Sequence, residues 1–221
     1  MKKAEQVLGI IYIPIHAAAM PLLVALIGAL AGAELSGPYQ MLLYYTISFV
    51  LVFIMMFSFL RESFSDFIGD FRRSVRAVIF GYVIYRTLLW VAALLMDPFV
   101  TGNDPNSEAI IADIAANFKI MLVVTSVLAP IVEETIFRGA LFGAIRQKNR
   151  ALAYIVSVLA FSLFHLWDAL LFEFSWNTLL HIVYYIPPSI ALAWCYDSSG
   201  TIWAPVLLHS LMNVFSSLQL R

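Results

Sequence analysis

The stretch APIVEETIFRG, residues 129–139, places charged side chains inside an apolar run of the chain. Glu133, Glu134 and Arg138 lie within residues 118–145, which are mostly apolar. A run of this length is typical of a helix that crosses a bilayer, because such a helix needs about 20 apolar residues. An ionisable side chain in the hydrocarbon region costs at least ~2.5–3.5 kcal/mol, so each one requires a partner or a function. The stretch therefore predicts a membrane-spanning helix that carries a buried polar site.

The composition extends this interpretation to the whole chain. Of its 221 residues, 62% are hydrophobic and 12% are charged, and the mean hydropathy is +0.88. Soluble domains use about 45–50% apolar residues, so a soluble core cannot absorb this much apolar surface. We therefore predict an all-α fold, a polytopic membrane helical bundle of about seven transmembrane helices. Besides residues 118–145, the predicted spans are residues 7–32, 40–60, 77–96, 151–170, 178–196 and 201–218.

Basic and acidic residues alternate between the connections that join these spans. Short loops rich in lysine and arginine stay in the cytoplasm, so we expect an integral membrane protein with its N-terminus in the cytoplasm and Arg221 outside. The net charge of −1 gives no basic field for nucleic acid, so we expect the lipid bilayer but no nucleic acid as a partner. The predicted cytoplasmic residues are Lys2, Lys3, Arg61, Arg72, Arg73, Arg76, Arg146, Lys148 and Arg150, and the predicted outer residues are Glu34, Asp97, Asp104, Glu108, Asp113, Asp168 and Glu173.

The chain shows no internal repeat and no segment long enough for a separate soluble domain. Its longest polar stretch, residues 97–117, is too short to fold alone. We therefore expect a single membrane domain over residues 1–221. Within it, residues 1–117 form three accessory spans with their loops, and residues 118–218 form a four-helix catalytic core.

The three charged residues of the fourth predicted span differ in their expected roles. Glu134 and Arg138 are four residues apart, so they share a helix face and can form an ion pair that offsets part of the cost of burial. Glu133 points about 100° around the helix from Glu134 and can reach the interior of the bundle. It has no obvious local partner, which favours a chemical role over a structural one.

Two other predicted spans carry polar side chains at a similar depth. His165 lies in the fifth span, and His209 and Asn213 lie four residues apart on one face of the seventh. At a rise of about 1.5 Å per residue, all three occupy the same depth band as Glu133. Three helices thus bring a carboxylate, two imidazoles and an amide to one level, as a buried polar site in a helical bundle requires.

These residue types favour hydrolysis of an amide bond inside the membrane. A buried carboxylate beside a neutral imidazole, here Glu133 and His165, can hold a water molecule and take its proton. A second imidazole and an amide N–H, here His209 and Asn213, can donate hydrogen bonds to the oxyanion that forms. The chain has no Gly-Xaa-Ser-Xaa-Gly elbow, and its only cysteine, Cys195, has no histidine near it in the sequence. We therefore favour direct attack by water.

A metal site is the alternative that the same residues leave open. Glu133, His165 and His209 match the two-histidine, one-glutamate set of some catalytic zinc sites. The His-Glu-Xaa-Xaa-His helix of many zinc proteases is absent, but that absence removes only one metal arrangement. We expect no cofactor, with zinc as the alternative.

Three motifs, in order along the chain, resemble the CAAX protease and bacteriocin-processing family, also called CPBP or Abi. The resemblance covers roughly residues 118–215, and the first three spans match only in being hydrophobic. Each motif alone is weak, but three in order within membrane spans make the resemblance specific. The motifs are Glu133-Glu134-Xaa-Xaa-Xaa-Arg138, Phe161-Xaa-Xaa-Xaa-His165 and His209-Xaa-Xaa-Xaa-Asn213.

The resemblance implies a glutamate-type intramembrane endopeptidase that acts on a membrane-associated protein or peptide. It implies that Glu133 activates water together with His165, and that His209 and Asn213 stabilise the oxyanion. Glu134 and Arg138 would then be orienting or structural residues. The compact chain resembles the prokaryotic members of the family, which implies a prokaryotic plasma membrane.

Two other function classes use the same residue types. A transporter can employ intramembrane carboxylates and histidines as a proton relay, and a non-catalytic bacteriocin immunity protein can keep them for packing. The remaining histidines, His16 and His181, lie outside the three motifs, and we assign them no role.

Overall fold

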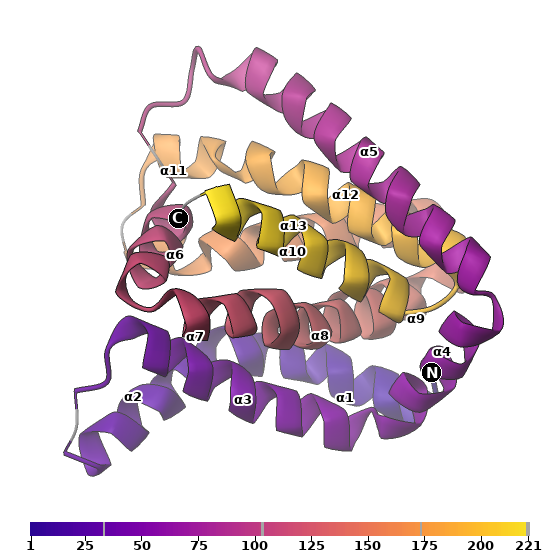
Figure 1. The fold of residues 1–221 in the computed structure, drawn as a ribbon, viewed down its shortest axis with the longest axis horizontal. Coiled ribbons are helices and arrows are strands. Elements are labelled where there is room, and N and C mark those ends of the chain that lie inside the picture. The colour runs from indigo at the N-terminus through magenta and orange to yellow at the C-terminus, as the bar shows by residue number, and fades with distance from the viewer. Residues whose placement is uncertain (33, 103, 173, 220–221) are drawn as a thin grey trace.

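A computed structural model describes residues 1–32, 34–102, 104–172 and 174–219, and these residues form helices and connecting turns without a β-strand (Figure 1). The predicted outer residue Glu173 and the predicted outer terminus Arg221 lie outside these described residues. Among the described residues, six helices are long and apolar enough to cross a membrane: Lys3–Leu30, Gly37–Met55, Phe71–Met96, Phe118–Arg146, Arg150–Phe172 and Trp176–Ser199. The all-α membrane bundle predicted from the sequence is confirmed.

Several of these spans contain π-helical turns or short breaks. The seventh predicted span is a helix of 17 residues, at the lower end of the length that crosses a bilayer. In chain order the helices are α1 (Lys3–Pro14), η1 (Ile15–Ala19), α2 (Met20–Leu30), α3 (Gly37–Met55), α4 (Phe57–Gly69), α5 (Phe71–Met96), α6 (Pro105–Ala116), α7 (Phe118–Val123), η2 (Val124–Leu128), α8 (Ala129–Glu134), η3 (Thr135–Phe142), α9 (Gly143–Arg146), α10 (Arg150–Phe172), α11 (Trp176–Leu180), α12 (Ile182–Ser199) and α13 (Trp203–Gln219).

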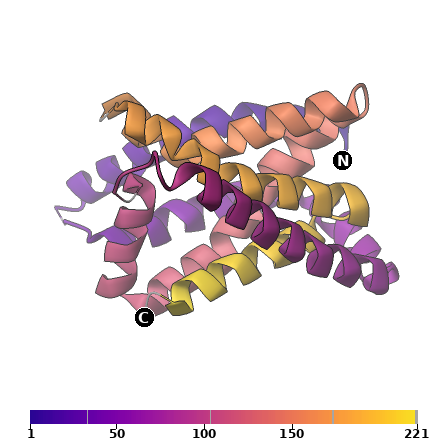
Figure 2. The same ribbon diagram turned by 90° about the horizontal axis from the view of Figure 1, so that it is seen from above.

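The span that carries the two glutamates is the central helix of the bundle. In its most apolar stretch 67% of the residues are buried, against 17% in α5. Figure 1 shows this span, α7 to α9, between α1 and α3 on one side and α10, α12 and α13 on the other. A helix that is apolar on all sides is stable in such a central position, where other helices cover every face. Figure 2 shows α5 crossing over α12 and α13.

Two π-helical segments flank the short helix that carries the glutamates. The segment η2 ends directly before α8, and η3 begins directly after Glu134. Pro130, in the first turn of α8, has no backbone N–H, so the preceding turn cannot keep a regular α-helical hydrogen bond to it. Widened turns of this kind occur often at functional sites, because they change the direction in which side chains point.

The second predicted span, residues 40–60, ends earlier in the structure than in the sequence interpretation. Helix α3 ends at Met55, and α4 begins at Phe57 after Met56 leaves the helical region at φ −124° and ψ 25°. The first N–H groups of α4 need partners outside the helix. Glu5 supplies one, because its Oε1 accepts a hydrogen bond from the N–H of Phe59 at 3.1 Å. Contact with the N-terminal helix therefore fixes the bend.

Basic side chains gather at one end of the bundle, and the connections at the other end carry acidic ones. Figure 1 shows α4 and α9 at one end and α6 and α11 at the other. Arg72 and Arg146 belong to the first end, and Asp97 and Asp104 belong to the second. This separation agrees with the alternation on which the predicted orientation depends, and the cytoplasmic placement of the basic end stays a prediction.

Candidate functional site

The ion pair predicted between Glu134 and Arg138 is confirmed, and a third residue joins it. Nη1 of Arg138 lies 3.1 Å from Oε1 of Glu134, and both side chains are fully buried. Nδ1 of His209, on α13, lies 2.9 Å from the same oxygen. Glu134 therefore connects its own helix to α13, a link that helical spacing within one span does not reveal.

Arg138 is held by contacts from two further helices. Its Nη2 donates to the carbonyl oxygen of Ser189 at 3.2 Å and to the hydroxyl of Ser189 at 3.0 Å, both on α12. Its guanidinium carbon lies 4.0 Å from the ring centre of Phe161 on α10, which is a cation–π contact. Removing one partner from a buried charge is strongly destabilising, so we expect these contacts to stabilise the fold. They also fix the position of the guanidinium, which agrees with the predicted orienting or structural role of Arg138.

Glu133 has a partner that the sequence interpretation missed. The hydroxyl of Tyr45, on α3, donates to Oε1 of Glu133 at 2.6 Å, and both residues are buried. Tyr45 belongs to an accessory span, and nothing in its local sequence distinguishes it from the tyrosines around it. Only a general rule could have indicated this contact: a tyrosine hydroxyl inside a membrane span normally needs a hydrogen-bond partner.

The second oxygen of Glu133 faces His165. Oε2 of Glu133 lies 3.9 Å from Nε2 of His165, and this oxygen has no hydrogen-bond partner among the described residues. Nδ1 of His165 lies 2.9 Å from the carbonyl oxygen of Phe161. A carbonyl oxygen only accepts, so Nδ1 carries the proton, and Nε2 of the neutral ring keeps its lone pair. Two hydrogen-bond acceptors therefore face each other across a short gap.

His165 is the more exposed residue of the pair that it forms with Glu133. Its side chain is 17% exposed, whereas that of Glu133 is 4% exposed. Phe161 packs against the rings of both motif histidines, with centroids 4.4 Å from His165 and 5.9 Å from His209. Tyr185, on α12, lies on another side of His165 at a centroid distance of 4.9 Å. The exposed part of this pair is thus the ring of His165, beside Tyr185.

Asn213 lies one turn after His209 on α13 and makes a different contact. Its Nδ2 donates to the carbonyl oxygen of Thr125, in η2, at 2.7 Å. An amide nitrogen has two N–H groups, so one stays available to a ligand. The structure gives Asn213 no direct contact with Glu133 or His165 among the described residues, and its role in the site stays a prediction.

His16, to which the sequence interpretation gave no role, packs beside this site. It is fully buried, with Nδ1 3.2 Å from the hydroxyl of Ser48 and Nε2 3.2 Å from the hydroxyl of Tyr44. Its ring lies 5.8 Å from that of Tyr45 and 5.3 Å from that of Phe164, centre to centre. His16 therefore belongs to the polar and aromatic packing that supports the tyrosine bound to Glu133.

The positions of the possible metal ligands test the zinc alternative. Within the described ranges, no three side chains of histidine, cysteine, aspartate or glutamate lie close enough together to hold a metal ion. Nδ1 of His209 is engaged with Glu134, which leaves only Nε2 of this ring for any other ligand. The arrangement therefore does not fit a zinc ion bound by Glu133, His165 and His209 together.

Comparison with known proteins relates the second half of the chain to one family. The model of the family described as type II CAAX prenyl endopeptidase Rce1-like matches residues 115–215. The Bacillus subtilis (strain 168) protein named "Putative membrane peptidase YdiL" is 30% identical over 118 residues, which cover 53% of this chain and 44% of that protein. "Membrane-embedded CAAX protease MroQ" of Staphylococcus aureus (strain USA300) is 26% identical over 143 residues, which cover 62% of this chain and 54% of that protein.

These matches confirm the family resemblance that the three motifs predicted. The family match covers all three motifs and leaves residues 1–114, including Tyr45, outside it. The chain spans about half the length of these two relatives. No solved structure matches the chain.

Proposed function

We propose that this chain, whose residues 115–215 match the Rce1-like family, is an intramembrane endopeptidase. It hydrolyses a peptide bond of a membrane-associated protein or peptide substrate with water that Glu133 and His165 activate. The observation that carries the proposal is the distance of 3.9 Å between Oε2 of Glu133 and Nε2 of His165. The names of the relatives, a membrane peptidase and a CAAX protease, support the same activity.

The gap between Glu133 and His165 suits a water molecule that donates to both. A direct hydrogen bond from nitrogen to oxygen is about 2.7–3.2 Å long, so 3.9 Å is too far for one. Both atoms are acceptors when the ring is neutral, and a water molecule has two O–H donors. Each donor meets one acceptor, which leaves the lone pairs of the water oxygen directed toward a substrate.

The reaction then follows as general base catalysis. The water oxygen attacks the carbonyl carbon of the substrate peptide bond, and Glu133 takes the proton. The C–N bond breaks, the proton passes from Glu133 to the leaving nitrogen, and a new carboxyl group and an amine are released. Tyr45, which donates to Oε1 of Glu133, holds the carboxylate with Oε2 toward the water.

His209 and Asn213 are the proposed donors to the oxyanion. Asn213 has one N–H beyond the bond to Thr125, and fixed donors of this kind typically contribute about 10²–10³ in rate. His209 directs Nδ1 to Glu134, so its Nε2 donates when the ring carries both protons. In this account Glu134 and Arg138 position His209 and do not contact the substrate.

The proposed setting is a prokaryotic plasma membrane with the N-terminus in the cytoplasm. The separation of basic and acidic ends supports this orientation. Of the charged or imidazole side chains of the site, Glu133, Glu134, Arg138 and His209 are buried, and His165 is partly exposed. Burial of the reacting groups strengthens their electrostatic interactions, because little water screens them.

Cleavage measured with and without a chelator distinguishes the proposed mechanism from a zinc-dependent protease and from a protein without peptidase activity. Purified protein in detergent is incubated with a library of membrane-associated peptides, with and without a strong chelator, and the products are identified by mass spectrometry. Cleavage that survives the chelator supports water activation by Glu133 and His165 without a metal. Loss of cleavage that zinc restores would favour the zinc-dependent version of the protease. Cleavage of no peptide would favour the immunity protein or the transporter.

A further inference from the structure

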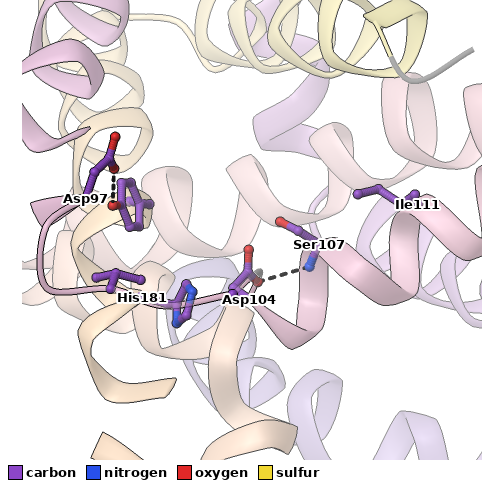
Figure 3. A pocket seen from close by; sticks show the side chains of 8 residues that line it. Asp97, Asp104, Ser107, Ile111 and His181 are labelled. Atoms are coloured by element: carbon purple, nitrogen blue, oxygen red, sulfur yellow. Dashed lines mark hydrogen bonds between the residues drawn. The ribbon is translucent and has the colours of Figure 1, made fainter. Parts of the chain in front are cut away.

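A pocket with polar lining residues lies at the acidic end of the bundle, where the connection between α5 and α6 meets the start of α12. Its volume is about 410 Å³. Figure 3 shows Asp97, Asp104 and His181 around this pocket, with Ser107 and Ile111 on α6. Tyr184 also lines the pocket, and none of the lining residues is a lysine or arginine.

Two carboxylates in the pocket keep acceptor capacity for a ligand. Asp97 accepts a hydrogen bond from the hydroxyl of Tyr184 at 2.6 Å. Asp104 accepts through Oδ1 from the N–H of Ser107 at 3.0 Å and from the hydroxyl of Tyr185 at 2.7 Å. An ionised carboxylate offers about four lone-pair positions, so neither group is saturated by these bonds.

His181 adds an acceptor that has no partner. Its side chain lines the pocket, and only 4% of the residue is exposed. Nδ1 lies 2.8 Å from the carbonyl oxygen of Asn177, which only accepts, so Nδ1 carries the proton. Nε2 of the neutral ring is then an acceptor, and it has no hydrogen-bond partner within the described part of the chain. An unpartnered buried acceptor points to a ligand that donates hydrogen bonds.

A single tyrosine connects this pocket to the proposed active site. The hydroxyl of Tyr185 donates to Asp104, and its ring packs on the ring of His165 at a centroid distance of 4.9 Å. His165 is also the more exposed residue of the pair that it forms with Glu133. A peptide in an extended conformation advances about 3.3–3.6 Å per residue, so a few residues are enough to reach from the pocket past Tyr185 to Glu133 and His165.

We propose that this pocket is a substrate subsite that binds a cationic group of the peptide, an ammonium or a guanidinium. The inference rests on the proposed peptidase function. Asp97, Asp104 and His181 present acceptors, and a cationic group presents three or more N–H donors with a positive charge. The ring of Tyr184 provides a face for a cation–π contact. Binding there places the peptide bond to be cleaved a few residues away, at the ring of His165.

The cationic group has two possible sources, a lysine or arginine side chain and a free N-terminal amine. A peptide that wild type cleaves is therefore prepared with lysine at successive positions, with norleucine in place of lysine, and with a free or acetylated N-terminus. Norleucine has nearly the same length as lysine without the charge. Preference for lysine at one fixed distance from the cleaved bond identifies the side chain as the ligand, and preference for the unacetylated peptide identifies the N-terminus.

The matched variants are Asp97→Asn in the pocket and Asp113→Asn on α6 outside it. Asp113 does not line the pocket, so its variant removes the same charge at the same end of the bundle. For the cationic peptide, Asp97→Asn raises KM by roughly tenfold or more, the loss expected for a charge-assisted hydrogen bond. Asp97→Asn does not change KM for the neutral peptide. Asp113→Asn changes KM for neither the cationic nor the neutral peptide. Equal kcat/KM for cationic and neutral peptides in wild type would overturn the subsite.

Binding to the Glu133→Gln protein separates this inference from the peptidase function. A fluorescent cationic peptide binds this protein more tightly than its neutral counterpart, and Asp97→Asn removes the difference. Charge-dependent binding without any cleavage by wild type would support the pocket and contradict the peptidase. Cleavage by wild type without charge-dependent binding would contradict the pocket and leave the peptidase supported.

Discussion

Tyr45 donates a hydrogen bond of 2.6 Å to Glu133 across 88 positions of sequence. The bond connects α3 to the helix that carries the carboxylate proposed to react. Because the family match covers residues 115–215, the phenol comes from outside the matched segment. In the proposed mechanism it occupies one carboxylate oxygen and leaves the other for water. The second predicted span therefore contributes a side chain to the site itself.

Replacing Tyr45 with phenylalanine tests this contribution. The variant removes only the hydroxyl, so Glu133 loses the donor at Oε1 but keeps the aromatic packing around it. We expect kcat to fall by about tenfold, the effect of losing a hydrogen bond to a charged group, while KM changes little. Steady-state cleavage kinetics measure both values. Tyr39→Phe, at an exposed position, is the control. An unchanged kcat in Tyr45→Phe would show that Glu133 does not need the phenol.

Arg138 is the second test, and its readout is stability. Arg138→Met keeps much of the side-chain volume but leaves Glu134 without its buried cation. We expect a loss of about 3–5 kcal/mol, the range for breaking one side of a buried ion pair. Thermal unfolding in detergent measures the loss. Arg72→Met at the exposed start of α5 is the control, with an expected change within about 0.5 kcal/mol. Equal stability of the two variants would mean that Arg138 does not compensate Glu134.

The close contact of α1 with the central helix gives a third prediction. A Cβ added at Gly9 would lie 2.5 Å from Cβ of Ala140 in η3, whereas one added at Gly69 meets nothing within 4 Å. Overpacking typically costs about 1–3 kcal/mol, so we expect Gly9→Ala to be destabilising by that amount and Gly69→Ala to be near neutral. Unfolding of both variants in the same detergent compares them. Similar stabilities would contradict the packing of α1 on the central helix.

The sequence predicted the positions of the spans more accurately than the contacts between them. Residues 118–145 were expected to form one span, and the structure has a span over Phe118–Arg146. The pairing of Glu134 with Arg138 was predictable because it depends only on spacing within one helix. The π-helical segments on both sides of α8 were not predictable, because a pattern with a period of 3.6 residues assumes a regular helix.

Contacts between helices account for what the sequence did not reveal. The bonds from Tyr45 to Glu133, from Arg138 to Ser189 and from His209 to Glu134 each join two spans. Their formation depends on the rotation and vertical register of each helix, which packing against neighbours determines. The pocket at Asp97 and His181 depends in the same way on how the connection between α5 and α6 meets α12. The assigned catalytic roles and the division into accessory spans and core stay predictions.

The most direct test of the account is the cleavage rate of Glu133→Gln measured beside that of wild type. Glutamine keeps an oxygen that accepts the hydrogen bond of Tyr45, but it cannot take a proton from water. The exposed Glu62→Gln serves as the control for loss of a carboxylate, and thermal unfolding shows that each variant is folded. The account predicts that folded Glu133→Gln loses at least about 10²-fold in kcat while Glu62→Gln cleaves like wild type. Cleavage at the wild-type rate by folded Glu133→Gln would contradict the proposed mechanism.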